Sequence, residues 1–257
     1  DEKTHRFVEQ YQKKNKNIKL FKDPGKGKSY AINLLLPSLK GDIIILSDGD
    51  VYVSENSINE ILDKFKDKEV GCVSGYPISQ NSKDTILGYW SNILCYAAHK
   101  LREKRARKKQ FLECSGYLWA FRNKIIKNFP LDVGEDTIVP IMFHLKDWKI
   151  AYAPEAKVFI KYPEKLNEFL KQKRRTAGAH DNIGKYVALK KIPRMKTFLN
   201  EITESYTLFA YAKNTREIFY TFLIFPIRLY IWLNLFYNSY IKKRKYTAAW
   251  KNVKGTK

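Results

Sequence analysis

The spacing of apolar residues along the first third of the chain alternates between the spacing of helices and that of strands. Short apolar runs predict strands at residues 17–21, 42–46 and 69–74. Apolar residues three and four apart predict helices at 29–39 and 54–65, with Ser54 as the N-cap of the second. The run at 42–46 (DIIIL) has polar residues on both sides, which is typical of a strand buried on both faces. This order of elements favours an α/β fold with a parallel sheet.

The middle of the chain predicts one long helix and several further strands. Residues 84–110 begin with apolar residues at helical spacing and end in the strongly basic run HKLREKRARKKQ. This basic half is either a solvated helix face or a surface that lies against phospholipid headgroups. A shorter helix is expected at 137–143, and further strands are expected at 113–122, 151–153 and 157–162.

A long apolar stretch stands near the end of the chain. Residues 218–241 contain a single charge, Arg228, and the basic run KKRK follows at 242–245. The length reaches the roughly 20 residues that cross a bilayer, but Pro226 and Arg228 near the middle weaken that interpretation. A spanning helix, a helix in the membrane interface and a buried core helix therefore all remain open. If the helix spans, the basic run predicts a cytoplasmic carboxyl end.

The composition narrows the class of protein. With 44% hydrophobic residues the chain can bury a core, which excludes a disordered or low-complexity protein. The net charge of +22 predicts an anionic partner: nucleic acid, an anionic membrane face or a phosphorylated small molecule. The three cysteines are too few and too scattered for a disulfide framework or a zinc site, so a reducing, cytosolic compartment is expected.

Two aspartates are candidates for a metal site. Asp48 and Asp50 stand one residue apart in SDGD, directly after the strand predicted at 42–46. Ligands of open α/β sheets bind beyond the carboxyl ends of the strands, and two carboxylates there can hold a hard divalent cation. A plain Asp-Gly turn with exposed carboxylates is the alternative.

The segment PGKGKSYAIN contains a lysine that could meet a phosphate. Gly27, Lys28 and Ser29 suggest a P-loop, but that motif requires a glycine where Lys22 stands, so a P-loop is excluded. Lys28 and backbone amides at a helix start can still bind a phosphate, or they form a basic solvated loop.

Acidic and basic clusters farther along the chain supply further candidates. Glu135 and Asp136 follow Gly134 at the predicted start of a helix, where they are either helix-capping carboxylates or a catalytic base. Gln172, Arg174 and Arg175 lie in a dense basic segment that suits diphosphate oxygens, or that forms a solvated helix face.

Taken in order, these segments resemble the family 2 inverting glycosyltransferases, especially the membrane-associated cellulose, hyaluronan and poly-N-acetylglucosamine synthases. GKGKSYAIN is similar to that family's lysine–alanine–leucine–asparagine segment, and SDGDVYV to its metal-binding D-x-D. SGYLWAFR resembles the strand and loop beside the acceptor site, and GEDT resembles the motif that carries the general base. QKRR matches the start of Q-x-x-R-W. The resemblance covers about residues 20–180.

The resemblance implies a fold, an activity and a set of site residues. The fold would be a nucleotide-diphospho-sugar transferase α/β domain of the glycosyltransferase-A type, with a mixed sheet flanked by helices, at residues 1–180; a membrane-associated helical region would follow at 181–257. The reaction would move a sugar from a nucleotide sugar, UDP-linked in the first instance, to a glycan or lipid-linked acceptor at the cytoplasmic membrane face. The implied residues, by role, are Asp136 with Glu135 in catalysis; Asp48 and Asp50 for Mg²⁺ or Mn²⁺; Lys28, Asp48, Gln172, Arg174 and Arg175 for the nucleotide sugar; and Ser115, Gly116, Tyr117 and Trp119 for the acceptor.

The sequence departs from the family pattern at two places, and three rival classes of protein also fit parts of it. Thr176 stands where Q-x-x-R-W has its tryptophan, and the family's opening strand is expected before Asp1. A nucleic-acid-binding module fits the charge, but the sequence has no recognised nucleic-acid motif, so no nucleic-acid partner is expected. A non-catalytic membrane-surface protein on the same fold and a nucleotidyltransferase are the second and third rival classes.

Overall fold

The structure is a computed structural model, and it describes residues 2–178, 180, 182–188, 192, 195 and 202–241. Five strands form its sheet: β1 (Ile43–Ser47), β2 (Tyr52–Val53), β3 (Val70–Ser79), β4 (Leu118–Arg122) and β5 (Lys149–Ile160). The helices that accompany the sheet are α1 (Glu2–Lys14), α2 (Lys28–Leu35), α3 (Ser57–Lys64), α4 (Ile86–Arg107), α5 (Glu135–His144) and α6 (Leu166–Gly178). Short 3-10 turns lie at η1 (Leu36–Ser38) and η2 (Ile183–Lys185), and the last described elements are α8 (Tyr206–Phe209), α9 (Thr215–Phe236) and η4 (Tyr237–Ile241).

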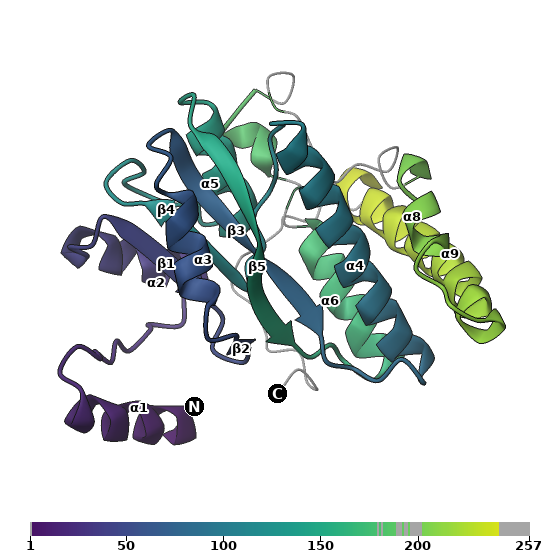
Figure 1. Cartoon of the computed structure of the whole chain (residues 1–257), viewed down its shortest axis with the longest axis horizontal. Coiled ribbons are helices and arrows are strands. Elements are labelled where there is room, and N and C mark those ends of the chain that lie inside the picture. The colour runs from purple at the N-terminus through teal and green to yellow at the C-terminus, as the bar shows by residue number, and fades with distance from the viewer. Residues whose placement is uncertain are drawn as a thin grey trace.

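The sheet is mixed, with the strand order β1-β4-β3-β5-β2 (Figure 1). β4 runs antiparallel to both of its neighbours, β1 and β3, and β2 runs antiparallel to β5. β3 and β5 are parallel, and they pair along most of their length from Val70↔Lys149 to Ser79↔Ile160. The expectation of a parallel sheet, drawn from the strand and helix alternation, is therefore wrong for every pair except this one. β4 comes later in the chain than β1 and β3, and it lies between them in the sheet.

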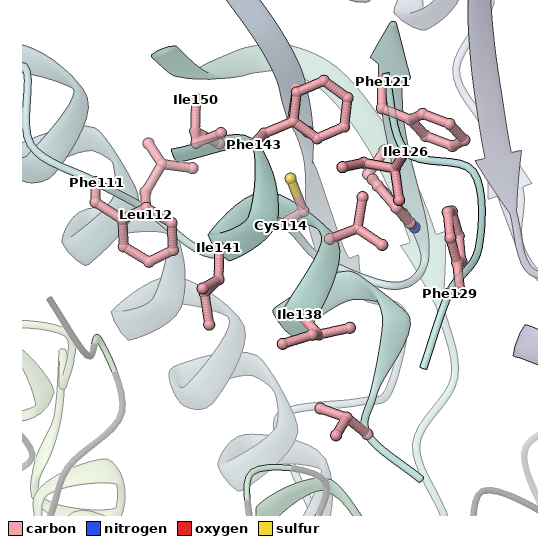
Figure 2. Close-up of a cluster of buried hydrophobic side chains, with 14 of the residues drawn as sticks. Phe111, Leu112, Cys114, Phe121, Ile126, Phe129, Ile138, Ile141, Phe143 and Ile150 are labelled. Carbon is pink, nitrogen blue, oxygen red and sulfur yellow. The ribbon is translucent and has the colours of Figure 1, made fainter. Parts of the chain in front are cut away.

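Successive residues of the central strands point to opposite faces of the sheet and supply two hydrophobic layers. Cys72 and Trp119 pack in one layer, whereas their neighbours Val73 and Ala120 pack in the other, and none of these four side chains has exposed surface. The first layer is closed by α2 and α5, and part of it is drawn in Figure 2. The second layer is closed by α3, α4, α6 and α9.

The helix α9 packs against the domain rather than standing away from it. In Figure 1, α4 and α6 lie between the sheet and the outer pair α8 and α9. The Tyr89 hydroxyl and the Thr221 hydroxyl are 2.8 Å apart and both buried, and the Trp90 indole donates to the Tyr220 carbonyl at 2.8 Å. By length and composition α9 could cross a membrane, with a mean hydropathy of 1.5 over its most apolar window. The basic run predicted at 242–245 lies outside the described residues.

Several local expectations need correction. Residues 17–21 are not a strand, and the strands expected at 151–153 and 157–162 are one continuous strand, β5. β1 packs into both hydrophobic layers, with Ile44 and Leu46 in one and Ile43 and Ile45 in the other. It pairs only with β4 among the described strands, however, and most of its side chains are half-buried rather than fully buried. The N-cap of α3 is Asn56; Ser54 lies before it, and its hydroxyl is 2.7 Å from that of Ser57.

Candidate active site

Four separate segments meet beyond the end of β1. The antiparallel pairing of β1 with β4 continues past Ser47↔Leu118, where the Asp48 amide donates to the Tyr117 carbonyl at 3.3 Å. This contact places Asp48 beside Gly116. Lys28 opens α2, which begins after Gly27 at a φ of +105°, a left-handed conformation that favours glycine. The first turn of α5 brings two further acidic residues to the same place.

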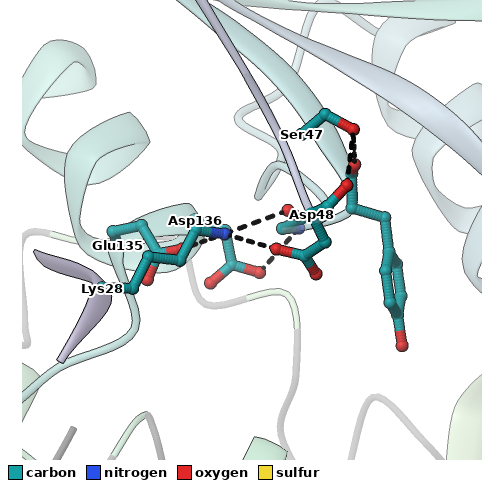
Figure 3. Close-up of polar contacts among 7 residues, drawn as sticks. Lys28, Ser47, Asp48, Glu135 and Asp136 are labelled. Atoms are coloured by element: carbon teal, nitrogen blue, oxygen red, sulfur yellow. Dashed lines mark hydrogen bonds and ion pairs between the residues drawn. The ribbon is translucent and has the colours of Figure 1, made fainter. Parts of the chain in front are cut away.

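The Lys28 ammonium is the centre of this cluster (Figure 3). Its Nζ lies 2.7 Å from Asp48 Oδ1 and 2.8 Å from Glu135 Oε1, and it also donates to the Gly116 carbonyl at 3.4 Å. An ammonium has three N–H donors, so these contacts occupy all of them. A contact between Lys28 and a phosphate of a nucleotide sugar would require one of these partners to be released.

The cluster shifts the proton affinity of its members in two ways. Burial by itself would lower the pKa of Lys28, but the carboxylates of Glu135 and Asp48 outweigh it and raise that pKa above its ordinary value. Burial raises the pKa of Glu135, Lys28 opposes the rise, and repulsion from Asp136 adds to it. Lys28 is therefore firmly cationic, and its charge limits the rise in the pKa of Glu135 that burial causes.

Asp136 is held from the other side by Gly116. The Gly116 amide donates to Asp136 Oδ2 at 3.0 Å. A Cβ at position 116 would lie only 3.1 Å from the same oxygen, tighter than an ordinary contact. The absence of a side chain therefore allows the backbone to approach the carboxylate. The position of Asp136 in the first turn of α5 also favours its negative charge.

Asp50 lies on the turn after β1 with its side chain exposed, and Asp48 is half-buried. Within the described part of the chain, no group of three or more His, Cys, Asp and Glu side chains is arranged to hold a metal ion. Mg²⁺ bound with a diphosphate commonly takes only one or two protein carboxylates, with phosphate and water oxygens completing its shell. Two oxygen-donating carboxylates on one accessible turn are thus a donor set that fits Mg²⁺ or Mn²⁺.

The basic helix α6 influences Tyr117, at the cluster, through the charge of Arg175. Burial raises the pKa of the Tyr117 hydroxyl, Asp48 adds to that rise, and Arg175 opposes it, so both charges act on this hydroxyl. Gln172 is buried on α6, and its Oε1 has no hydrogen-bond partner among the described residues. Arg174 Nε donates to the Leu170 carbonyl one turn earlier in the same helix.

The residues expected at the acceptor side separate into two groups. Gly116 and the half-buried Tyr117 lie at the cluster, and the Ser115 amide donates to the buried hydroxyl of Ser74. Trp119, in contrast, has no exposed surface; it packs in the core, where its ring centroid is 5.3 Å from that of Phe121. The expectation that Trp119 contacts the acceptor is therefore corrected: side chains alternate along β4, and position 119 lies in the hydrophobic layer that α2 and α5 close.

Sequence reasoning missed one polar network beside the cluster. His180 Nε2 lies 3.2 Å from Glu113 Oε2 and 3.5 Å from the hydroxyl of Thr137, the residue after Asp136. Glu113 is 2% exposed, so this contact supplies a partner for a buried carboxylate. The three residues are far apart in the sequence, and although Thr137 belongs to GEDT no single motif includes all three, so the sequence offered no signal for their meeting.

A mixed sheet flanked by helices, with carboxylates gathered around a lysine at a strand end, defines the class of protein as an α/β fold with a charged site at the edge of its sheet. The same fold occurs in the solved structure titled "Mannosyltransferase PcManGT from Pyrobaculum calidifontis in complex with GDP-Man and Mn2+", with a TM-score of 0.60. At 16% identity, over 92% of this chain and 74% of that chain, this likeness shows the glycosyltransferase-A type fold. The mixed sheet with flanking helices that the resemblance implied is thus confirmed.

The chain belongs to the family described as Glycosyltransferase like family 2, whose model matches residues 1–179. Among curated relatives, an N-acetylglucosaminyltransferase of Rhizobium meliloti (strain 1021) is 26% identical over 166 residues, which are 59% of this chain and 38% of that protein. A poly-beta-1,6-N-acetyl-D-glucosamine synthase of Staphylococcus aureus (strain COL) is 28% identical over 189 residues, 66% of this chain and 43% of that protein. The chain thus spans less than half the length of these relatives, and the family expected from the motifs is confirmed.

Proposed function

We propose that the chain transfers a sugar from a nucleotide-diphosphate sugar to a hydroxyl of a glycan or lipid-linked acceptor, with inversion at the anomeric carbon. The observation that carries this proposal is the convergence of Asp48, Lys28, Glu135 and Asp136 beyond the end of β1 in a family 2 fold. Ligands of open α/β sheets bind at such a strand end.

Asp136 is the general base in this proposal. The acceptor hydroxyl attacks the anomeric carbon, a new C–O bond forms, and the bond from that carbon to the nucleoside diphosphate breaks. The hydroxyl proton passes to the Asp136 carboxylate. The Gly116 amide holds Oδ2 at 3.0 Å, which fixes the orientation of the carboxylate; we assign the proton to Oδ1.

Glu135 and Lys28 position this base. The Lys28 ammonium ties α2 to the first turn of α5 and to the turn after β1, because it contacts both Glu135 and Asp48. Ion pairing with Lys28 also limits the repulsion between the adjacent carboxylates of Glu135 and Asp136. Glu135 is therefore a positioning residue, which affects the reaction through Asp136 and Lys28.

The nucleoside diphosphate is assigned to the turn after β1 and to α6. Asp48 and Asp50 would hold Mg²⁺ or Mn²⁺, which would stabilise negative charge on the departing diphosphate when bound. Arginine forks suit diphosphate oxygens, so Arg174 and Arg175 are assigned to the diphosphate, and Gln172 to the same helix face. The names of the two curated relatives favour N-acetylglucosamine as the sugar, so a UDP-linked N-acetylglucosamine is the first substrate to test.

Residues 1–180 form the catalytic part in this proposal, and residues 181–257 attach it to the cytoplasmic face of a membrane. The support is α9, which is long and apolar enough to enter a bilayer and which packs beside the catalytic part. The acceptor would accordingly be reached at or near the membrane surface.

The test is Asp136→Asn in the full chain, with release of nucleoside diphosphate as the readout. Asparagine can keep the hydrogen bond from Gly116 but cannot take the proton, so turnover should fall by roughly 100-fold or more. Loss of the charge at the helix start should lower stability by less than about 1 kcal/mol. Binding of UDP with Mn²⁺ should be unchanged, since the assigned diphosphate residues are untouched.

Asp147→Asn is the matched control, because Asp147 is an exposed aspartate in the turn after α5 with a φ of +63°, which asparagine also adopts. It should transfer sugar normally. Normal transfer by Asp136→Asn would return Asp136 to the role of a helix-capping carboxylate. Release of pyrophosphate in place of UDP would identify a nucleotidyltransferase, and the absence of any nucleotide release would favour a non-catalytic protein.

A further inference from the structure

The two sides of α9 differ sharply. Its side toward α4 and α6 buries Thr221, Ile224 and Ile231, and each of these is 1% exposed or less. The opposite side, here named the outer face, consists of apolar side chains that are each 44–59% exposed: Ile218, Phe219, Phe222, Leu229, Leu233 and Phe236. At 100° per residue these six positions fall within about a third of the helix circumference. An exposed apolar face of this kind marks a surface that contacts a membrane or another protein.

The charge of Arg228 does not interrupt the outer face. Its angular position lies with Thr221 and Ile224 on the packed side of α9, and its side chain is half-buried. One side of α9 therefore packs against the domain, and the outer face is apolar along the length of the helix. That is the geometry of a helix lying in the plane of a membrane interface with its apolar side in the acyl region.

A cleft of about 440 Å³ lies between the basic half of α4 and the chain around α8. Its lining includes Lys100, Lys104, Arg107 and Lys108 from α4 and its end, and Tyr206 from α8. The volume lies in the range of roughly 300–1,000 Å³ that is typical of small-ligand sites. The cleft is thus large enough for a small polar group, and its cations come from one helix.

The cations of the cleft exceed the carboxylates that they contact. Lys100 and Arg107 both pair with Glu103 at 3.1 Å, and Lys104 pairs with Glu204 at 2.7 Å. Lys108 pairs with no carboxylate among the described residues. Among the described residues these four cations therefore contact two carboxylates, which gives the cleft a net positive charge that favours an anion.

Aromatic residues at the two ends of α8 border the cleft and the outer face. Tyr206, which lines the cleft, is 60% exposed and stands at the other end of α8 from Phe209. The Phe209 ring centroid is 5.2 Å from that of Phe222, an outer-face residue. Figure 1 shows α8 and α9 together on the side of α4 that faces away from the sheet. The cleft and the outer face of α9 thus both border α8.

We infer that the cleft between α4 and α8 binds the headgroup of an anionic phospholipid while the outer face of α9 lies among the acyl chains of the same leaflet. The site would hold the domain on the membrane in one orientation. The inference deepens the membrane attachment proposed above for residues 181–257 and rests on it, but it does not depend on the transferase activity, since it concerns residues outside the candidate active site.

The test is flotation of the full chain with vesicles of phosphatidylcholine, with and without phosphatidylglycerol. The cleft variant is Arg107→Gln with Lys108→Gln, which leaves the Lys104–Glu204 contact between α4 and the α8 segment intact. Each basic residue near an anionic membrane surface contributes about 1 kcal/mol to binding, which is about fivefold in affinity. Because the double variant removes two such residues, it should bind phosphatidylglycerol vesicles roughly 30-fold more weakly. Its binding to pure phosphatidylcholine should be unchanged.

The charge-matched control is Lys127→Gln with Lys146→Gln, two exposed lysines outside both the cleft and the candidate active site. It removes the same net charge and should weaken binding by less than about threefold, because only charges near the membrane surface contribute strongly.

A second variant, Phe219→Ser with Phe222→Ser, should weaken binding to both kinds of vesicle. Equal losses in the cleft and control variants would overturn the headgroup site, and unchanged binding in the phenylalanine variant would overturn the outer-face contact. Binding of glycerol phosphate in solution with the same dependence on Arg107 and Lys108, without vesicle binding, would assign the cleft to a soluble phosphate.

Discussion

Replacement of Lys28 by methionine tests the ionic centre of the site most directly. Methionine keeps an unbranched side chain of similar length but removes the ammonium that contacts Asp48 and Glu135. It leaves the carboxylate of Glu135, which is only 13% exposed, next to Asp136 without its cation. The substitution thus measures how much the stability of the fold depends on the charge of Lys28.

The expected loss follows from the burial of the partners. Removal of one member of a fully buried ion pair destabilises by about 3–5 kcal/mol, whereas exposed pairs contribute about 0–1 kcal/mol. Glu135 is nearly buried, but Lys28 and Asp48 are each about one-third exposed, at 32% and 33%. An intermediate value of about 2 kcal/mol at neutral pH is expected, which lowers Tm by roughly 4–8 °C.

The pH dependence distinguishes this cause from a packing defect. Burial raises the pKa of Glu135 above 4.5, so the stability linked to this group is fully present below that value and is lost as pH rises through the folded-state pKa. Without Lys28 the pKa of Glu135 rises further, and the variant loses more stability than the wild type over this window. The difference between the two proteins should therefore be small at about pH 4.5 and reach its full size near pH 7.

Chemical denaturation of both proteins across this pH range measures the difference. Lys22→Met, a change of an exposed lysine in the preceding loop, is the control and should stay within about 0.5 kcal/mol of the wild type. A difference for Lys28→Met below about 0.5 kcal/mol at pH 7, or one that does not change with pH, would refute the electrostatic reasoning.

Two further substitutions test the neighbouring contacts. Gly116→Ala should place a Cβ about 3.1 Å from Asp136 Oδ2 and displace that carboxylate, so nucleoside diphosphate release should fall by roughly tenfold with the melting temperature little changed; full activity would show that the position of Asp136 is not critical. Asp50→Asn should leave stability within about 0.5 kcal/mol, because the side chain is exposed, while raising the Mn²⁺ concentration needed for half-maximal transfer; an unchanged metal requirement would place the ion elsewhere.

Individual helices and strands could be predicted from the sequence because the apolar pattern that indicates each one lies within its own residues. The apolar spacing of residues 29–39, 54–65 and 84–110 predicts helices close to α2, α3 and α4, and the apolar runs predict β1 and β3. The pairing of β1 with β4 could not be read from periodicity, because it joins residues 43–47 to residues 118–122 across four other elements: β2, α3, β3 and α4. The mixed order of the sheet was therefore available only from the resemblance to a family.

The candidate site shows the same division. Motifs identify Asp48, Lys28 and Asp136, and the structure brings all three to one place. The motifs do not predict the contacts among these residues. The sequence suggests a phosphate as the partner of Lys28, whereas in the structure Lys28 contacts two carboxylates and a backbone carbonyl. The expectation for Trp119 is wrong because its motif identifies a strand but not which face of the sheet a given residue takes.

The packing of α9 bears on how the chain can be divided. A fragment that ended after α6 would retain the whole family match, yet it would expose the side chains that α9 now covers on α4. Tyr89 would lose the Thr221 hydroxyl, and Trp90 would lose the Tyr220 carbonyl that accepts its indole N–H. Trp90 also lies 6.0 Å, centroid to centroid, from Phe169 of α6, the helix that carries Gln172 and the arginines. Removal of α9 would therefore disturb the layer that supports α6, so a loss of activity in such a fragment would not by itself distinguish membrane attachment from support of the site.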